Sequence, residues 1–307
     1  MENRVLKTLL EKITPYLEMP HINEIIFVQE KEFFLERAGE YFRMEDSALD
    51  GQFLRNFCIQ LANARNLNFD AKHPALSCSI PHTRYRIQAL HASITRNNQI
   101  ALNIRVPSMQ KYPLTDFLLG PDCSLDYEGM RNLVQQGYNI LISGGTGSGK
   151  TSLLNTLIEE IPLHQRIVTI EDSPELHVKN PNKTQILVGK QEEGGFTYED
   201  ALNSTMRLSP QRLLLGEIDT RNTMLFLRLG NTGHEGMIST LHANSIADAL
   251  KAISLNIKMY RGAKDIDAKN VEAYFKSAVH YIIQIQKQGK QRMITQIQST
   301  QEWENGS

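Results

Sequence analysis

The chain lacks several features that would mark a specialised class of protein. Among its 307 residues there are only three cysteines and one tryptophan, and 33 basic residues nearly balance 34 acidic ones. No stretch approaches the roughly 18 consecutive apolar residues of a membrane-spanning helix, and the N-terminal Met-Glu-Asn-Arg is not followed by the apolar core of a signal peptide. A net charge of −1 does not indicate a protein that coats nucleic acid or an anionic membrane. We therefore expect a cytoplasmic globular protein, and nucleic acid is not indicated by charge.

The cysteines Cys58, Cys78 and Cys123 are too far apart in sequence to form a CxxC pair. This spacing excludes the common zinc-binding and thiol-exchange motifs, and an odd number of cysteines argues against a disulfide framework. We predict buried, unpaired thiols in a reducing compartment.

Two patterns of predicted strands divide the chain into domains. Residues 1–117 combine an amphipathic helix at 2–17 with short strands rich in branched and aromatic residues, which predicts an α+β domain. A cluster of turn-forming residues then predicts a linker at 118–128. Residues 129–307 alternate apolar strands with helices, as in a largely parallel sheet covered on both faces. We therefore predict an α/β second domain.

The expected elements follow from these patterns. Strands are predicted at 22–28, 32–36, 84–91 and 100–106, then at 138–142, 166–171, 212–218 and 236–241, and helices at 48–65 and 152–160. Two further helices begin with capping-box signals, Thr197 with Asp200 and Ser245 with Asp248.

Eight residues between a predicted strand and a predicted helix form the pattern GxxxxGK[ST]. They are Gly144, Gly145, Thr146, Gly147, Ser148, Gly149, Lys150 and Thr151, and Ser152 follows. In this pattern backbone N–H groups surround phosphate oxygens, the lysine reaches the β- and γ-phosphates, and the hydroxyl ligates magnesium. The sequence predicts an ATP site at 144–152 with Thr151 as the Mg2+ ligand. The alternative is a glycine-rich turn that binds no nucleotide.

Carboxylates end two of the predicted strands. Glu171 and Asp172 follow one apolar strand, and Glu217 follows a glycine at the end of another. Ligands of open α/β sheets bind at this edge, and phosphoryl transfer needs a positioned water and a metal. Glu171 is our candidate for activating water, assisted by Glu217. A solvated strand end or a helix cap is the alternative for Glu171 and Asp172, and apolar strands ending in glutamate are common.

The histidines His234 and His242 lie eight residues apart across a predicted strand. Metal binding is disfavoured because no third ligand has suitable spacing, and a lone histidine is usually satisfied by ordinary packing. His242 ends the strand just before a capped helix, so we interpret it as a sensor of the γ-phosphate.

Four segments, GGTGSGKT, TIEDSPEL, LLLGEI and TGHEGMISTLHANS, resemble in this order and spacing the Walker A, Asp, Walker B and His boxes of the secretion superfamily of ring ATPases. Within it the chain is most similar to the traffic ATPases of bacterial type IV secretion systems, the eleventh component of the VirB set. The resemblance covers nearly the whole length, because residues 22–26 and 104–108 also match the family's N-terminal domain.

The resemblance implies a homo-hexamer in which nucleotide is held between the two domains of each subunit. The implied fold class is α/β, a RecA-like P-loop ATPase domain preceded by a smaller α+β N-terminal domain. It also implies that Arg86 and Arg105 offer charge to the phosphates, a role that suits the bidentate, permanently charged guanidinium. From the residues alone, two surface arginines at strand ends are an equally good interpretation.

The chain departs from the family's usual pattern at two positions. Asp219 stands where an arginine usually follows Walker B, with Arg221 two positions on as a candidate substitute, and Gln211 stands where aspartate is frequent. The four-cysteine insertion of type II secretion ATPases and the Gly-Glu-Met-Arg-Asp of pilus retraction ATPases are absent. These departures bear on the rate of hydrolysis more than on nucleotide binding.

Together these features predict a hexameric cytoplasmic ATPase that hydrolyses Mg-ATP to power substrate transfer or assembly of a type IV secretion or conjugation system. It would dock on other cytoplasmic or inner-membrane components, peripheral on the inner face of the inner membrane. Two alternatives stay open: a nucleotide-binding regulatory subunit with little hydrolysis, which Asp219 would fit, and a nucleic-acid translocase, which would need a basic lumen.

Overall fold

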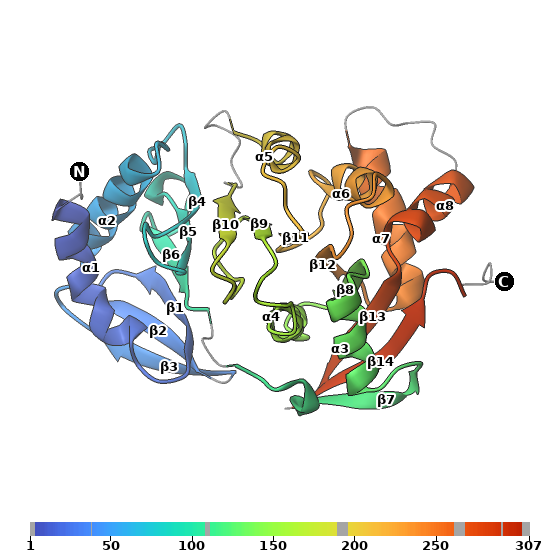
Figure 1. Cartoon of the computed structure of the whole chain (residues 1–307). Coiled ribbons are helices and arrows are strands. Elements are labelled where there is room, and N and C mark those ends of the chain that lie inside the picture. The colour runs from blue at the N-terminus through green and yellow to red at the C-terminus, as the bar shows by residue number, and fades with distance from the viewer. Residues whose placement is uncertain are drawn as a thin grey trace. The chain divides into compact units, whose positions relative to one another are not determined.

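Figure 1 shows the computed structural model of the chain, which describes residues 4–37, 39–107, 111–188, 196–260, 268–289 and 291–302. The described residues form two compact units, the first over 4–107 and the second over the remaining ranges. Each unit has its own sheet and its own hydrophobic core.

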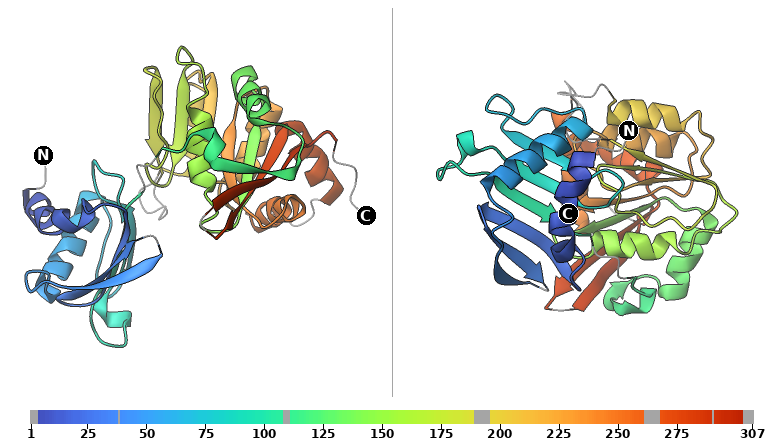
Figure 2. Two further views of the ribbon diagram at one scale, coloured as in Figure 1. Left: turned by 90° about the horizontal axis from the view of Figure 1, so that it is seen from below. Right: turned by 90° about the vertical axis from the view of Figure 1, so that its left-hand side faces the viewer.

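The first unit is a six-stranded antiparallel sheet with two helices. Its elements are α1 (Arg4–Leu17), β1 (Ile22–Gln29), β2 (Glu32–Arg37), β3 (Glu40–Glu45), α2 (Gly51–Ala64), β4 (Ala75–Ser79), β5 (Arg86–Leu90), the 3-10 turn η1 (Ala92–Ile94) and β6 (Ala101–Arg105). The strand order is β3-β2-β1-β6-β5-β4. Helices α1 and α2 pack on each other and on the sheet, and their apolar faces close the core with the inward residues of β1 and β2 (Figure 2). The Asp50 side chain caps α2 by accepting from the Phe53 N–H.

The second unit is built on an eight-stranded, mainly parallel sheet. Its elements are η2 (Leu114–Asp116), β7 (Phe117–Cys123), α3 (Tyr127–Gln136), β8 (Ile140–Gly144), α4 (Lys150–Ile158), β9 (Ile167–Glu171), β10 (Lys183–Leu187), α5 (Tyr198–Thr205), β11 (Arg212–Leu215), α6 (Thr223–Asn231), β12 (Ile238–His242), α7 (Ile246–Met259), α8 (Ala268–Ala278), β13 (Tyr281–Gln288) and β14 (Gln291–Ser299). The order is β10-β9-β11-β12-β8-β13-β14-β7, and the β13–β14 hairpin is its antiparallel pair.

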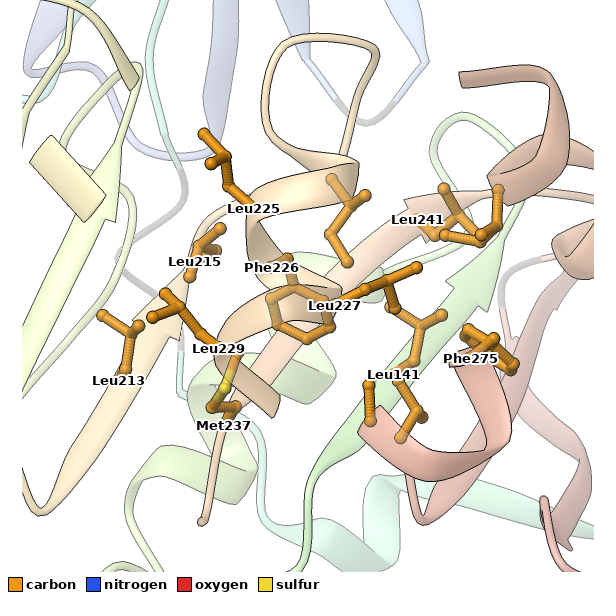
Figure 3. Packing of buried hydrophobic residues seen from close by; sticks show 14 of the residues in the cluster. Leu141, Leu213, Leu215, Leu225, Phe226, Leu227, Leu229, Met237, Leu241 and Phe275 are labelled. Carbon is orange, nitrogen blue, oxygen red and sulfur yellow. The ribbon is translucent and has the colours of Figure 1, made fainter. Parts of the chain in front are cut away.

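Helices cover both faces of this sheet because successive strand residues point to opposite sides. Ile140 and Ile142 pack with α3 and α4, whereas Leu141 packs with α6 and α8. Figure 3 shows the second of these cores, in which Phe226 and Phe275 are fully buried. The predicted fold class, an α+β domain before an α/β domain, is confirmed.

The predicted linker at 118–128 lies inside the second unit. Residues 117–123 form β7, which pairs in parallel with β14, and α3 begins at Tyr127. The turn-forming residues Gly120 and Pro121 mark a sheet edge instead, where a missing N–H does not interrupt a ladder. At Gly120 a Cβ would lie 3.1 Å from the Thr295 carbonyl oxygen, so the backbones approach closely there.

The prediction of buried, unpaired thiols holds in full for Cys58 alone. The three thiols are free, with Cys58 buried and the other two half-buried. Within the described ranges no helix is both long and apolar enough to span a bilayer.

Candidate active site

A glycine-rich loop joins β8 to α4. Strand β8 ends at Gly144 and α4 begins at Lys150. The N–H groups of the loop are therefore followed directly by the first N–H groups of the helix. Gly147 and Gly149 have φ angles of +71° and +100°, a region that glycine adopts without strain. The buried Ser148 hydroxyl has no hydrogen-bond partner in the described part of the chain. The Ser148 hydroxyl and the first N–H groups of α4, which have no partner inside the helix, are therefore donors for an anion at this loop.

The Lys150 side chain is buried and folded onto this loop. Its ammonium donates to the carbonyl oxygens of Gly144, at 2.8 Å, and Gly145, at 2.9 Å. Burial lowers the pKa of Lys150 to about 8, and the charge of Glu217 opposes this shift. A buried cation has lost its hydration, and without a full counter-charge it is stabilised when an anion binds beside it.

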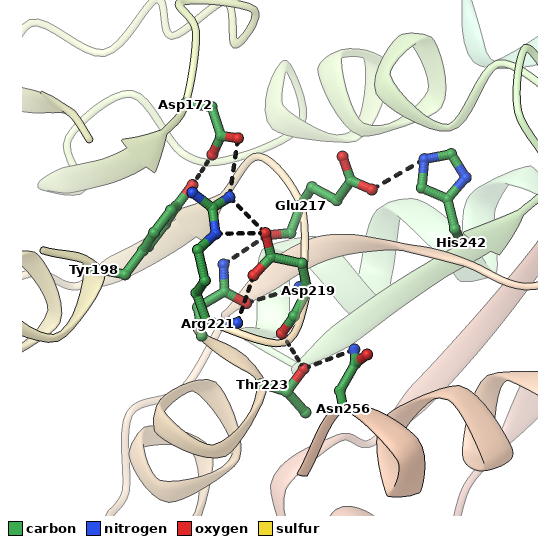
Figure 4. Close-up of polar contacts among 9 residues, drawn as sticks. Asp172, Tyr198, Glu217, Asp219, Arg221, Thr223, His242 and Asn256 are labelled. Carbon is green, nitrogen blue, oxygen red and sulfur yellow. Dashed lines mark hydrogen bonds and ion pairs between the residues drawn. The ribbon is translucent and has the colours of Figure 1, made fainter. Parts of the chain in front are cut away.

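Strand register brings His242 to the same place, since the Cα atom of His242 is paired with that of Gly144. Its Nδ1 lies 3.1 Å from the Lys150 ammonium, and its Nε2 lies 2.9 Å from the Glu217 carboxylate. An ammonium has only protons to offer, so Nδ1 accepts and Nε2 donates to Glu217. Three predicted site residues thus form one hydrogen-bonded chain, of which Figure 4 shows the His242–Glu217 contact.

Glu217 is an ionised carboxylate within reach of solvent. Burial acts to raise its pKa, but the hydrogen bond from His242 and the charge of Lys150 outweigh burial, so the pKa lies below its usual value. The side chain is 45% exposed. Such a carboxylate can accept a hydrogen bond from a water molecule beside the loop.

Glu171 has a different environment from the one that its position in the sequence predicts. Its side chain is 1% exposed, and Oε2 accepts from the N–H groups of Glu175 and Leu176, both at 2.7 Å. Oε1 accepts from the Thr169 hydroxyl at 3.0 Å. Burial raises the pKa of Glu171 to about 7, although these hydrogen bonds act against the shift. The carboxylate holds the loop after β9 and is closed to solvent.

A second polar cluster joins the loops after β9 and β11 (Figure 4). The Arg221 guanidinium lies 2.5 Å from the Asp219 carboxylate and 3.1 Å from that of Asp172, and it stacks on the Tyr198 ring with 4.8 Å between Cζ and the ring centroid. The Tyr198 hydroxyl donates to Asp172. The charge of Asp219 is therefore matched by Arg221. The sequence patterns indicated Asp172, Asp219 and Arg221. No motif indicates Tyr198.

Arg86 and Arg105 lie in the first unit as neighbours across two strands. The register of β5 against β6 pairs their Cα atoms directly, and Glu24 faces Arg105 from β1. Like charges at directly opposed positions repel. Glu24 already brings one acidic residue to this part of the sheet.

Thr151 and Ser152 lie in the first turn of α4, next to Lys150. In the described ranges no cluster of three His, Cys, Asp or Glu side chains is arranged to hold a metal. The Thr151 hydroxyl is an oxygen donor of the kind that Mg2+ accepts in proteins, where one or two protein oxygens, phosphates and water share the ion.

Comparison with known proteins decides the family. The family described as "Type II/IV secretion system protein" matches residues 80–301. The chain belongs to this family. It is 28% identical to the type IV secretion system protein VirB11 of Bartonella henselae, over 95% of this chain and 92% of that one. It is also 28% identical to PtlH of Bordetella pertussis, over 94% and 93%.

Solved structures agree with this assignment. The VirB11 ATPase from the Brucella suis type IV secretion system, in complex with sulphate, matches with a TM-score of 0.51 and 25% identity, over 96% of this chain and 97% of that one. The ATPase DotB of Legionella pneumophila matches in fold, with a TM-score of 0.64 and 16% identity, over 91% and 76%. The predicted resemblance to type IV secretion ATPases, and with it the prediction of a nucleotide-binding ATPase, is confirmed.

Proposed function

We propose that this secretion ATPase works as a cytoplasmic homohexamer that hydrolyses Mg-ATP and energises a type IV secretion machine from the inner face of the membrane. The names of its relatives support the machine, and the family resemblance supports the hexamer. The observation that carries the catalytic part is the Lys150–His242–Glu217 chain beside the glycine-rich loop.

The chemistry follows from exchange of partners at Lys150. When a triphosphate occupies the loop, the Lys150 ammonium leaves the carbonyls of Gly144 and Gly145 for phosphate oxygens. His242 Nδ1 then no longer accepts a hydrogen bond from Lys150. The ring can therefore change its hydrogen bonds when the γ-phosphate is bound. Glu217 accepts a proton from the attacking water as the new P–O bond forms and the bond to the ADP oxygen breaks.

Glu171 has a supporting role in this proposal. It fixes the loop after β9 through the N–H groups of Glu175 and Leu176 and does not itself activate water. The proposal thus assigns water activation to Glu217, where the sequence favours Glu171.

Mg2+ would be held by the Thr151 hydroxyl together with the phosphates. When bound, it neutralises charge that develops on the phosphate oxygens. We assign Arg86 and Arg105 to the same task, supported by the family resemblance and by their neighbouring positions on β5 and β6.

A regulatory subunit with little hydrolysis is less well supported. That alternative rested on the anionic Asp219 near the triphosphate, and Arg221 lies 2.5 Å from this carboxylate. A nucleic-acid translocase has no observation in its favour.

The substitution Lys150→Ala tests the proposal. We expect phosphate release to fall at least a hundredfold, because the variant lacks the cation that reaches the β- and γ-phosphates. Phosphate release is measured with saturating ATP and Mg2+. The matched control is Lys251→Ala, which removes an exposed lysine on α7 and should change the rate less than twofold. A Lys150→Ala variant that keeps more than a tenth of wild-type activity would refute the phosphate role.

A further inference from the structure

One arginine outside the sequence motifs lies against the glycine-rich loop. Arg292 is the second residue of β14, and its side chain passes over Gly149. A Cβ at Gly149 would lie 2.5 Å from the Arg292 Cδ and 2.7 Å from its Nε. The last glycine of the loop is thus required twice, by its φ of +100° and by the arginine that covers it.

The position of this side chain is fixed by packing. The Arg292 guanidinium stacks on the Tyr112 ring, with 4.3 Å between Cζ and the centroid. The Tyr112 carbonyl accepts from the Thr156 hydroxyl of α4 at 2.9 Å, and its ring packs edge-on against Phe117. Pairing of Arg292 with Phe117 of β7 sets the backbone. A cation held this way loses little conformational freedom when it binds an anion.

The guanidinium has no counter-charge of its own. Among the described residues, no carboxylate forms an ion pair with Arg292 and no acceptor takes a hydrogen bond from it. It lies instead against Gly149, the N-cap residue of α4, where the helix N-terminus is another source of positive potential. Such a grouping is repulsive until an anion enters.

We propose that Arg292 binds the nucleotide's phosphate chain beside Gly149, on the side of the α- and β-phosphates. The loop backbone surrounds these two phosphates, whereas Lys150 reaches the terminal ones. The inference rests on the proposed function, since it adds a contact to the same nucleotide site. Because ADP carries the same two phosphates, Arg292 contributes to the binding of substrate and product alike. It therefore lowers KM without changing kcat.

The substitution Arg292→Met tests this assignment. Methionine keeps an unbranched side chain over Gly149 and Tyr112 but removes the charge. We expect the Kd for ADP, the Kd for tripolyphosphate and the KM for ATP to rise together by about tenfold, with kcat within twofold of wild type. Raising the salt concentration to about 0.5 M should shrink the difference, because salt screens the lost charge. Arg292→Lys should fall between the two.

The control is Arg228→Met, an exposed arginine on α6, which should leave all four constants unchanged. If Arg292→Met unfolds, Arg292→Gln answers the same question. A variant with unaltered Kd values, or one weakened toward ADP and not toward tripolyphosphate, overturns the phosphate contact alone. A full-length wild-type chain that binds neither ADP nor tripolyphosphate overturns the proposed function and the role of Arg292 with it.

Discussion

Two glutamates follow neighbouring parallel strands of the second unit and have opposite surroundings. Glu171 ends β9, and Glu217 comes two residues after the last residue of β11. Glu171 is fully buried, accepts three hydrogen bonds from its own segment and has a raised pKa. Glu217 is nearly half exposed, accepts from His242 and has a lowered pKa. The same side chain is directed inward at one strand end and toward His242 at the other.

The difference teaches that two carboxylates at the carboxyl edge of one sheet can have opposite surroundings. The two surroundings differ because the N–H groups of the following loop donate to one carboxylate and not to the other. The loop after β9 turns back and presents the N–H groups of Glu175 and Leu176. The residues after Glu217 instead use Asn222, whose amide donates to the Glu217 carbonyl and leaves its carboxylate free for His242.

Among the changes that test this comparison, removing the charge of Glu217 should have the largest effect on kcat. In Glu217→Gln the side chain can no longer accept a proton from water, so kcat should fall by about 10²- to 10⁴-fold. ADP affinity should change less than threefold, because the phosphate-binding groups remain. Steady-state phosphate release and ADP titration measure the two quantities. A kcat within tenfold of wild type would show that water is activated elsewhere.

The buried state of Glu171 predicts a pH dependence of stability. Its pKa in the folded chain, about 7, is raised above the usual 4.5, so between these values the folded state holds a proton that the unfolded state has released. Its contribution to stability is complete below about pH 4.5 and is lost as the pH rises through 7. Glutamine carries no titrating proton, so wild type should lose on the order of 1–3 kcal/mol relative to Glu171→Gln between pH 5 and 8.

Urea unfolding of both proteins across this range measures the difference. A difference that stays constant with pH, or one that grows in favour of wild type as the pH rises, contradicts the buried carboxylate.

The sequence predicted the parts of the fold that follow from local pattern. The apolar runs at 166–171 and 236–241 became β9 and β12, and the capping boxes placed the starts of α5 and α7 at Tyr198 and Ile246. The β13–β14 hairpin was not predicted, although apolar and polar residues alternate from Ile283 to Gln286. Strand β7 was interpreted as a linker because Gly120 and Pro121 usually break strands.

The candidate site was predicted only in part, for a related reason. GxxxxGK[ST] located Lys150, but its meeting with His242 depends on the register of β12 against β8, which no local signal sets. The burial of Glu171 depends on a turn in the following loop, and Arg292 lies about 140 positions from Gly149. Contacts of this kind arise from packing between distant segments.

The most direct test of the account is the activity of Glu171→Gln at saturating Mg-ATP, measured beside Glu217→Gln in the same phosphate-release assay. The glutamine carbonyl oxygen can still accept from the N–H groups of Glu175 and Leu176, so we expect a kcat within about threefold of wild type. A loss of a hundredfold or more in Glu171→Gln, with Glu217→Gln nearly active, would reverse the two roles and contradict the account.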